Sequence, residues 1–177
     1  AGSGTHTITY NVGVSGCTDS DQIDITVNQT PNVSITNPGD FCETDPAMDI
    51  TASPAGGTWS GTGITNTTNG TFDPSVPGAG SYTVYYSVTN SGCTGIDSTE
   101  IDVYSTPDAT ITNPGDFCTD DAAYNLSAAS SGGTWSGTGI TDASNGTFDP
   151  SVAGSGTHTI TYNVGVSGCT DSDQIDI

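Results

Sequence analysis

The sequence contains no lysine and no arginine, against 20 aspartate and glutamate residues, and its formal net charge is −20 at pH 7. Binding to a nucleic-acid backbone needs cationic side chains, so this composition excludes nucleic acid as a partner. Anionic membrane surfaces repel the chain for the same reason. Trypsin-like proteases find no cleavage site, and no crosslink through a lysine can form. We therefore expect a strongly solvated acidic surface.

Long apolar runs and helical patterns are missing as well. No stretch is apolar over the length that crosses a bilayer, so we expect no membrane insertion in this segment. No stretch shows the apolar spacing of three and four residues that an amphipathic helix requires. No serine or cysteine lies in a nucleophile motif with either histidine, so we expect no enzymatic activity.

What the sequence does contain is repetition. Residues 1–25 recur without change at residues 153–177, an offset of 152. A looser repeat of 76 residues underlies this offset, with shared segments TNPGDFC, GGTWSGTGIT, NGTFDPSV and SGCT at matching places. Repetition at a fixed period predicts an array of similar units rather than one domain with a single site.

The period sets the predicted domain boundaries. We expect one complete repeat at 31–106, a nearly complete repeat at 107–177 that lacks the end of its last strand, and a fragment at 1–30 that matches the second half of a repeat. Thr106-Pro107 joins the repeats with almost no linker, and proline favours an extended backbone there. Short extended junctions predict a stiff array of repeats. We expect these 177 residues to be a segment of a longer array.

Alternating apolar and polar residues predict β-strands. The clearest strand is 81–88, in which Tyr82, Val84, Tyr86 and Val88 alternate with more polar positions. Further strands are expected at 32–36, 48–52, 57–60, 71–72 and 99–103, each bounded by turn residues. About seven short strands per repeat and one tryptophan of the buried type predict an all-β, immunoglobulin-like antiparallel β-sandwich. Gly78–Tyr82 resembles the tyrosine corner of such folds.

The five cysteines fit the period. Cys42 and Cys93 are 51 residues apart, as are Cys118 and Cys169, so one disulfide within each repeat is the simplest pairing. Cys17 matches Cys93 and Cys169, and its partner is expected upstream of residue 1. The spacings contain no CxxC and no Cys/His cluster of the kind that binds zinc. Disulfides predict an extracellular location.

Histidines and tryptophans are weak candidates for function. His6 and His158 share the context THT, but Tyr82 replaces them in the middle repeat, which favours a packing role over catalysis. Trp59 and Trp135 lie in GGTWSGTGI, where an exposed indole could stack on a sugar and a buried one would fill the core. Both interpretations of the tryptophans stay open, with the core favoured.

Four aspartate positions recur in both repeats: Asp40/Asp116, Asp45/Asp121, Asp73/Asp149 and Asp97/Asp173. Calcium takes six to eight oxygen ligands, and loops of this kind can supply them. The best candidate calcium site is Asp40 with Asp45, and correspondingly Asp116 with Asp121. The alternative is turn formation, which Asp-Pro and Asn-Pro-Gly-Asp favour strongly. No other cofactor is expected, and no ligand-binding residue can be named.

Together TNPGDFC, GGTWSGTGIT, NGTFDPSV, GSGTHTITYNV and SGCTDSD resemble tandem immunoglobulin-like or PKD-like repeats. Such repeats occur in giant Bacteroidetes cell-surface proteins, including gliding-motility adhesins and other cargo of the type IX secretion system. The resemblance covers the whole chain. It implies a cell-surface filament or adhesin whose repeats form a stalk and whose partners are neighbouring repeats, other copies in a fibre, or surface polysaccharide. The alternative is an array of glycan-binding modules attached to a secreted enzyme.

Overall fold

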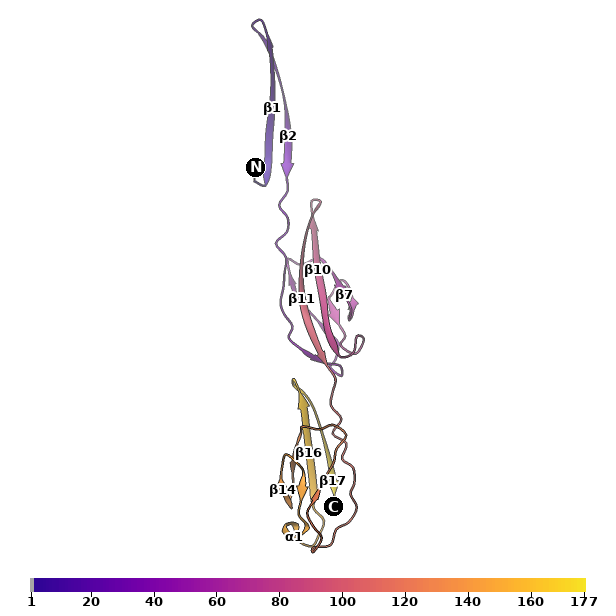
Figure 1. The fold of residues 1–177 in the computed structure, drawn as a ribbon. Helices are drawn as coiled ribbons and strands as arrows, with labels where there is room; N and C mark the ends of the chain where they lie inside the picture. Colours follow the sequence, from indigo (N-terminus) through magenta and orange to yellow (C-terminus); the bar gives the residue numbers. More distant parts are fainter. Residues whose placement is uncertain (1) are drawn as a thin grey trace. The chain divides into compact units, whose positions relative to one another are not determined.

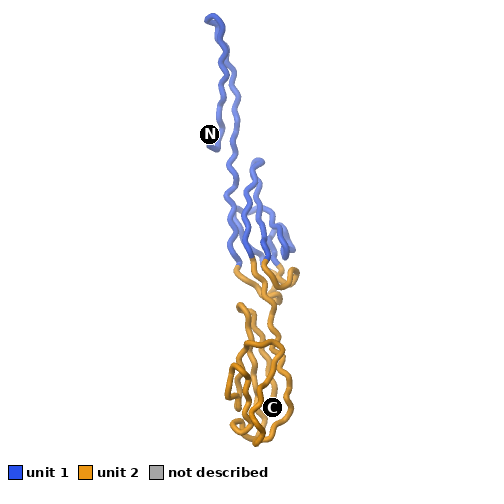
Figure 2. Tube along the Cα trace, viewed as in Figure 1, with its two compact units in different colours: residues 1–38, 48–72, 82–100 blue, residues 39–47, 73–81, 101–177 orange. Residues whose placement is uncertain are grey.

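The structure is a computed structural model that describes residues 2–177, and nearly all of its regular structure is β-strand (Figure 1). The predicted all-β fold is confirmed. The chain forms two compact units, one of residues 1–38, 48–72 and 82–100 and the other of residues 39–47, 73–81 and 101–177 (Figure 2). Among the described residues no helix has the length and apolarity needed to cross a membrane.

Unit 1 begins with a long β-hairpin. Strand β1 (Gly4–Val14) pairs antiparallel with β2 (Cys17–Val27) from Gly4↔Val27 to Val14↔Cys17, and these two strands form a sheet of their own. The apolar side chains that alternate along them are exposed, including Ile8 at 52% and Tyr10 at 69%. The hairpin therefore has regular backbone pairing without a core.

The rest of unit 1 combines several short strands with parts of two long ones around buried aromatic residues. Strand β3 (Ser34–Ile35) pairs with β6 (Ala52–Ser53), and β9 (Thr71–Phe72) lies between β5 (Met48–Asp49) and β8 (Ile64–Asn66). Strand β7 (Thr58–Gly61) pairs with β10 (Gly80–Asn90), which places Trp59 opposite Tyr86. The predicted strands are present, although several are only two residues long.

Strands β10 and β11 (Cys93–Tyr104) contribute residues to both units. They belong to a four-stranded sheet of order β4–β11–β10–β7. Within unit 2, β4 (Phe41–Cys42) pairs parallel with the end of β11, where Phe41 faces Val103 and Cys42 faces Tyr104. A short strand after the TNPGD loop is thus anchored to the last strand of the same repeat.

The remainder of unit 2 repeats these elements 76 residues later in the sequence. Strand β15 (Thr147–Phe148) lies between β12 (Tyr124–Asn125) and β14 (Ile140–Asp142), as β9 lies between β5 and β8. Strand β16 (Thr159–Val166) lies between β13 (Thr134–Ser136) and β17 (Cys169–Asp176), and Ile111 bridges to Ala128. The sequence repeat is therefore also a structural repeat.

The core of unit 2 is built around an aromatic pair. Trp135 and Tyr162 have ring centroids 4.5 Å apart, and the Tyr162 hydroxyl accepts a hydrogen bond from Gly133 N (2.8 Å) and donates one to Ser130 O (2.7 Å). A Cβ at Gly133 would lie 2.3 Å from Asn163 O, so only glycine allows this approach. The other core residues are Ala109, Ile111, Leu126, Phe148, Ile160 and Val164.

A short helix was not predicted. Helix α1 (Pro150–Ala153) is capped by Asp149, whose carboxylate accepts from Ser151 N and whose carbonyl accepts from Ala153 N at 3.0 Å. The middle repeat has Pro77 where this helix has Ala153, and proline has no N–H to donate. One substitution therefore explains why the equivalent segment there is a turn.

The cap of α1 predicts a pH effect. Hydrogen bonds from the Ser151 side chain, and from the backbone of Ser151 and Val152, lower the pKa of Asp149 below its usual value. Folding therefore favours the ionised form of Asp149. Its contribution to the stability of the folded state is complete above pH ~4 and is lost as the pH falls through the lowered pKa. We expect Asp149→Asn to flatten the acid limb of the unfolding curve of unit 2. Urea unfolding between pH 2 and pH 6 measures this, and an unchanged limb would contradict it.

Candidate functional site

The site with the most distinctive chemistry is a disulfide between the two sequence repeats. Cys42, from the TNPGDFC segment of residues 31–106, is bonded to Cys169 of residues 107–177, with a Cα–Cα distance of 5.6 Å and 127 residues between them in sequence. Both cysteines lie in unit 2. A loop of this length corresponds to about 5 kcal/mol of stabilisation by the chain-entropy estimate.

The loop that carries Cys42 is held by its own hydrogen bonds. The Asp45 carboxylate accepts from Cys42 N at 2.8 Å, and Asp45 N donates to Cys42 O at 2.9 Å. Glu43 N donates to Tyr104 O at 2.9 Å, which continues the parallel pairing of β4 with β11. The thiol of Cys42 is therefore presented from a closed turn that is fixed to the end of the repeat.

Cys169 enters the bridge from the tip of a hairpin. The turn between β16 and β17 contains Ser167 and Gly168 with φ values of 49° and 90°, which is the left-handed backbone that two-residue hairpin turns require. Cys169 is 2% exposed, and its Sγ lies 3.9 Å from Tyr104 O. The hairpin tip of residues 107–177 is thus placed beside the last strand of the preceding repeat.

The predicted disulfides within each repeat, Cys42 with Cys93 and Cys118 with Cys169, are wrong. Phe117, next to Cys118, packs on Phe148 and lies with Ile177 around one groove, whereas Cys169 starts the strand that runs toward Ile177. Eight residues at ~3.3 Å each separate the two ends by about 26 Å, far beyond the reach of a disulfide. Likewise, β11 separates Cys93 from Tyr104, the residue that Cys42 faces.

Three cysteines remain as thiols. Cys17 and Cys118 are exposed, and Cys93 is half-buried. Cys17, Cys93 and Cys169 each begin the second strand of a hairpin directly after a Ser-Gly turn. The expected upstream partner of Cys17 stays a prediction.

The tryptophans are core residues. Trp59 is 3% exposed and Trp135 5%, and Trp59 packs on Tyr86 with ring centroids 4.6 Å apart. Neither indole face is open to a sugar ring. The tryptophans therefore give no support to a glycan-binding array. The alternating pattern of residues 81–88 does not indicate a role for Tyr86 beyond the core. In the structure, the buried hydroxyls of Tyr86 and Tyr162 hold the glycine-rich segment beside each tryptophan.

The histidine rings bind the backbone. His158 Nε2 lies 3.0 Å from Gly154 O, and His6 Nε2 lies 2.7 Å from Gly2 O. Each ring is therefore hydrogen-bonded to a backbone carbonyl four residues upstream. Tyr82, at the equivalent place in the middle repeat, is half-buried.

Several of the recurring aspartates hold the backbone. Asp97 accepts from Ile35 N at 2.8 Å and Asp173 from Ile111 N at 2.9 Å, so each fixes the first strand of its repeat to the last. Asp73 and Asp149 accept from the serine two residues later, as the Asp-Pro turn predicts. These carboxylates have structural partners in both repeats.

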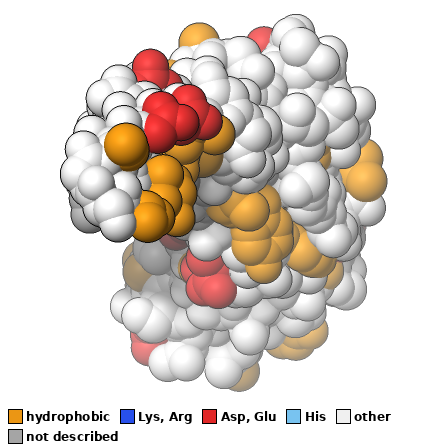
Figure 3. Space-filling view, turned by 90° about the horizontal axis from the view of Figure 1, so that it is seen from above, with side chains coloured by type: hydrophobic (Ala, Val, Ile, Leu, Met, Phe, Trp, Pro, Cys, Tyr) orange, Lys and Arg blue, Asp and Glu red, His pale blue; other side chains and the backbone are white. Residues whose placement is uncertain are grey.

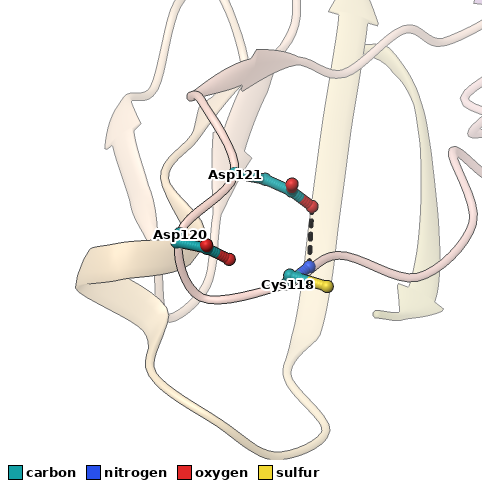
Figure 4. A group of neighbouring side chains, drawn as sticks. All are labelled: Cys118, Asp120 and Asp121. Atoms are coloured by element: carbon teal, nitrogen blue, oxygen red, sulfur yellow. Dashed lines mark hydrogen bonds between the residues drawn. The ribbon is translucent and has the colours of Figure 1, made fainter.

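For calcium, the structure gives a different grouping from the predicted one. Within residues 2–177, Cys118, Asp120 and Asp121 alone bring three potential ligand atoms within 4.8 Å, and all three are exposed (Figure 4). Asp121 accepts from Cys118 N at 2.7 Å, as Asp45 does from Cys42 N. Asp40 and Asp116 belong to no such group, so calcium binding at Asp40, Asp45, Asp116 and Asp121 stays a prediction.

Two exposed aspartates without a predicted role have lowered pKa values. Hydrogen bonds from Asn145 hold the pKa of Asp142 below its usual value, and those from Thr110 do the same for Asp108. Both carboxylates close turns with residues two or three positions later. Acidic side chains stand on the face shown in Figure 3, which has no basic group to neutralise them because the chain has none.

Comparison with known proteins gives distant structural neighbours only. No family model and no curated protein sequence matches the chain. A crystal structure of mouse protocadherin-24 EC1-3 is similar over 97% of this chain and 78% of its own, with 12% identity and a TM-score of 0.32. Extracellular cadherin domains 1-5 of protocadherin gamma B2 are similar over 97% of this chain and 44% of their own, with 11% identity and a TM-score of 0.34.

Proposed function

We propose that this chain is a structural repeat segment of a long extracellular filament or adhesin, in which the repeats act as a stalk. The observation that carries the proposal is the Cys42–Cys169 bridge, because it joins two consecutive repeats covalently. A load applied to the chain passes through the bridge and bypasses the residues between the two cysteines. A covalent bypass across a repeat junction is useful in a protein that must bear tension.

Composition supports a location outside the cell. Disulfides persist in oxidising compartments, and the charge of −20 without lysine or arginine favours separation of neighbouring copies in water. We place the segment at the cell surface, with neighbouring repeats of the same chain as its first partners and other copies or surface polysaccharide as further ones. Roles in adhesion and in gliding motility follow from the family resemblance, and no catalytic role is proposed.

Protease treatment of intact producing cells tests this placement. We expect proteinase K to remove the segment from the cell surface, whereas trypsin leaves it intact because the segment has no lysine or arginine. Immunoblotting with an antibody against residues 31–177 follows both treatments, and a cytoplasmic protein serves as the control for lysis. Electron microscopy should then show antibody-labelled thin fibres. Protection from proteinase K until the cells are lysed would contradict the proposal.

A further inference from the structure

A second pair of cysteines has the same local geometry as the bonded pair, although its members are thiols. The period of 76 residues maps Cys42 onto Cys118 and Cys169 onto Cys93. The Cys42–Cys169 bridge therefore shows that cysteines at these two positions of the repeat can form a disulfide.

Cys118 matches Cys42 in its loop. The Asp121 carboxylate accepts from Cys118 N at 2.7 Å, and Asp121 N donates to Cys118 O at 3.0 Å. The corresponding distances around Cys42 are 2.8 and 2.9 Å. Cys118 is an exposed thiol, whereas the sulfur of Cys42 is bonded to Cys169. The loop is therefore already closed before any disulfide forms.

Cys93 matches Cys169 at the hairpin tip. Its Sγ lies 3.8 Å from Asn28 O, and the bonded Cys169 Sγ lies 3.9 Å from Tyr104 O. Asn28 and Tyr104 are themselves one period apart; Asn28 directly follows strand β2, and Tyr104 is the last residue of β11. Asn28 also donates from its side chain to Ser91 O at 2.9 Å, which ties it to the same hairpin turn. Cys93 therefore occupies the same place relative to the preceding repeat as the disulfide-bonded Cys169.

We propose that Cys93 is a second inter-repeat disulfide site whose partner is the TNPGDFC cysteine of a preceding repeat, the counterpart of Cys118. The strand before Asn28 belongs to a hairpin identical to that of residues 153–177, so the repeat that precedes Cys93 is of the same type as residues 107–177. In a chain that continues with a period of 152 residues, Cys118 of one period bonds Cys93 of the next. Every repeat junction then carries one bridge.

The bond forms by oxidation of two thiols. The two sulfurs join, and two protons and two electrons pass to a disulfide oxidant such as oxidised glutathione, which becomes two molecules of reduced glutathione. This inference depends on the geometry of the bridge and not on the proposed adhesive role. A filament can lack the second bridge, and a non-adhesive repeat protein can have it.

A tandem chain tests the proposal. Residues 1–177 are followed directly by residues 26–177 of a second copy, which keeps the printed sequence intact because residues 1–25 and 153–177 are identical. The tandem holds nine cysteines, five from the first copy and four from the second. After refolding in a glutathione redox buffer, we expect three free thiols by titration under denaturing conditions. If only the two Cys42–Cys169 bridges form, five free thiols remain.

Two controls complete the experiment. Replacing Cys93 of the second copy by serine should raise the number of free thiols from three to four and leave both Cys42–Cys169 bridges in place. The 177-residue chain should have three free thiols, as in the structure. Digestion at acidic residues and mass spectrometry should identify the Cys118–Cys93 peptide pair. Five free thiols, or a Cys118–Cys93 pair that joins separate tandem molecules, would overturn the proposal.

Discussion

When the chain is stretched between its ends, breaking the Cys42–Cys169 bridge should lengthen the fully unfolded molecule by about 420 to 460 Å. The bridge bypasses 127 residues, and each extended residue adds ~3.3–3.6 Å. Single-molecule force spectroscopy of the oxidised chain and of Cys42→Ser measures this difference. The remaining cysteines, Cys17, Cys93 and Cys118, are replaced by serine in both chains to prevent exchange.

A matched variant separates this pairing from a disulfide within the repeat. In a chain with its other cysteines intact, Cys93→Ser should leave the extended length unchanged, because Cys93 is a thiol. If Cys42 were bonded to Cys93, the same variant would release 51 residues and lengthen the chain by about 170 to 180 Å. That result would contradict the bypass on which the proposed stalk function rests.

Tyr162→Ala should destabilise unit 2 by about 3–5 kcal/mol, whereas Tyr10→Ala should change stability by less than about 0.5 kcal/mol. The two tyrosines occupy the same place in identical 25-residue segments, but Tyr162 is 2% exposed and Tyr10 is 69% exposed. Truncation at Tyr162 leaves a cavity beside Trp135 and removes the hydroxyl that pairs with Gly133 N and Ser130 O. Truncation at Tyr10 removes a solvated side chain.

Urea unfolding followed by tryptophan fluorescence measures both variants, since Trp135 contacts Tyr162 directly. The pair controls for local sequence, because every residue from position 1 to 25 is matched at 153 to 177. Equal destabilisation by the two substitutions would show that the β1–β2 hairpin has a core of its own, contrary to the structure.

Strand positions and core residues followed from the sequence because burial imposes a simple period on a strand. The alternation around Val84 and Tyr86 correctly placed both side chains in the core. The role of the tyrosine hydroxyls did not follow, since their acceptors Pro54 O and Ser130 O belong to loops 32 residues away in sequence. The alternation of apolar residues indicates which face of a strand is buried. It does not indicate which backbone groups the side chains on that face contact.

The disulfide pairing could not be predicted from spacing alone. On a period of 76 residues, a separation of 51 within a repeat and one of 127 between consecutive repeats leave the same pattern of cysteines. The deciding information is the position of the first strand in the structure: it starts beside the hairpin tip, where Pro31 O approaches Gly95, and then leads away toward the TNPGDFC loop. Cys42 and Cys93 therefore lie at opposite ends of their repeat.

Disulfide mapping of the 177-residue chain is the most direct test of this account. The chain is oxidised, its free thiols are blocked by alkylation, and it is cleaved at aspartate and glutamate without reduction before mass spectrometry. The structure predicts one linked peptide pair, Cys42 with Cys169, and alkylation at Cys17, Cys93 and Cys118. Linked pairs of Cys42 with Cys93 and of Cys118 with Cys169 would contradict it.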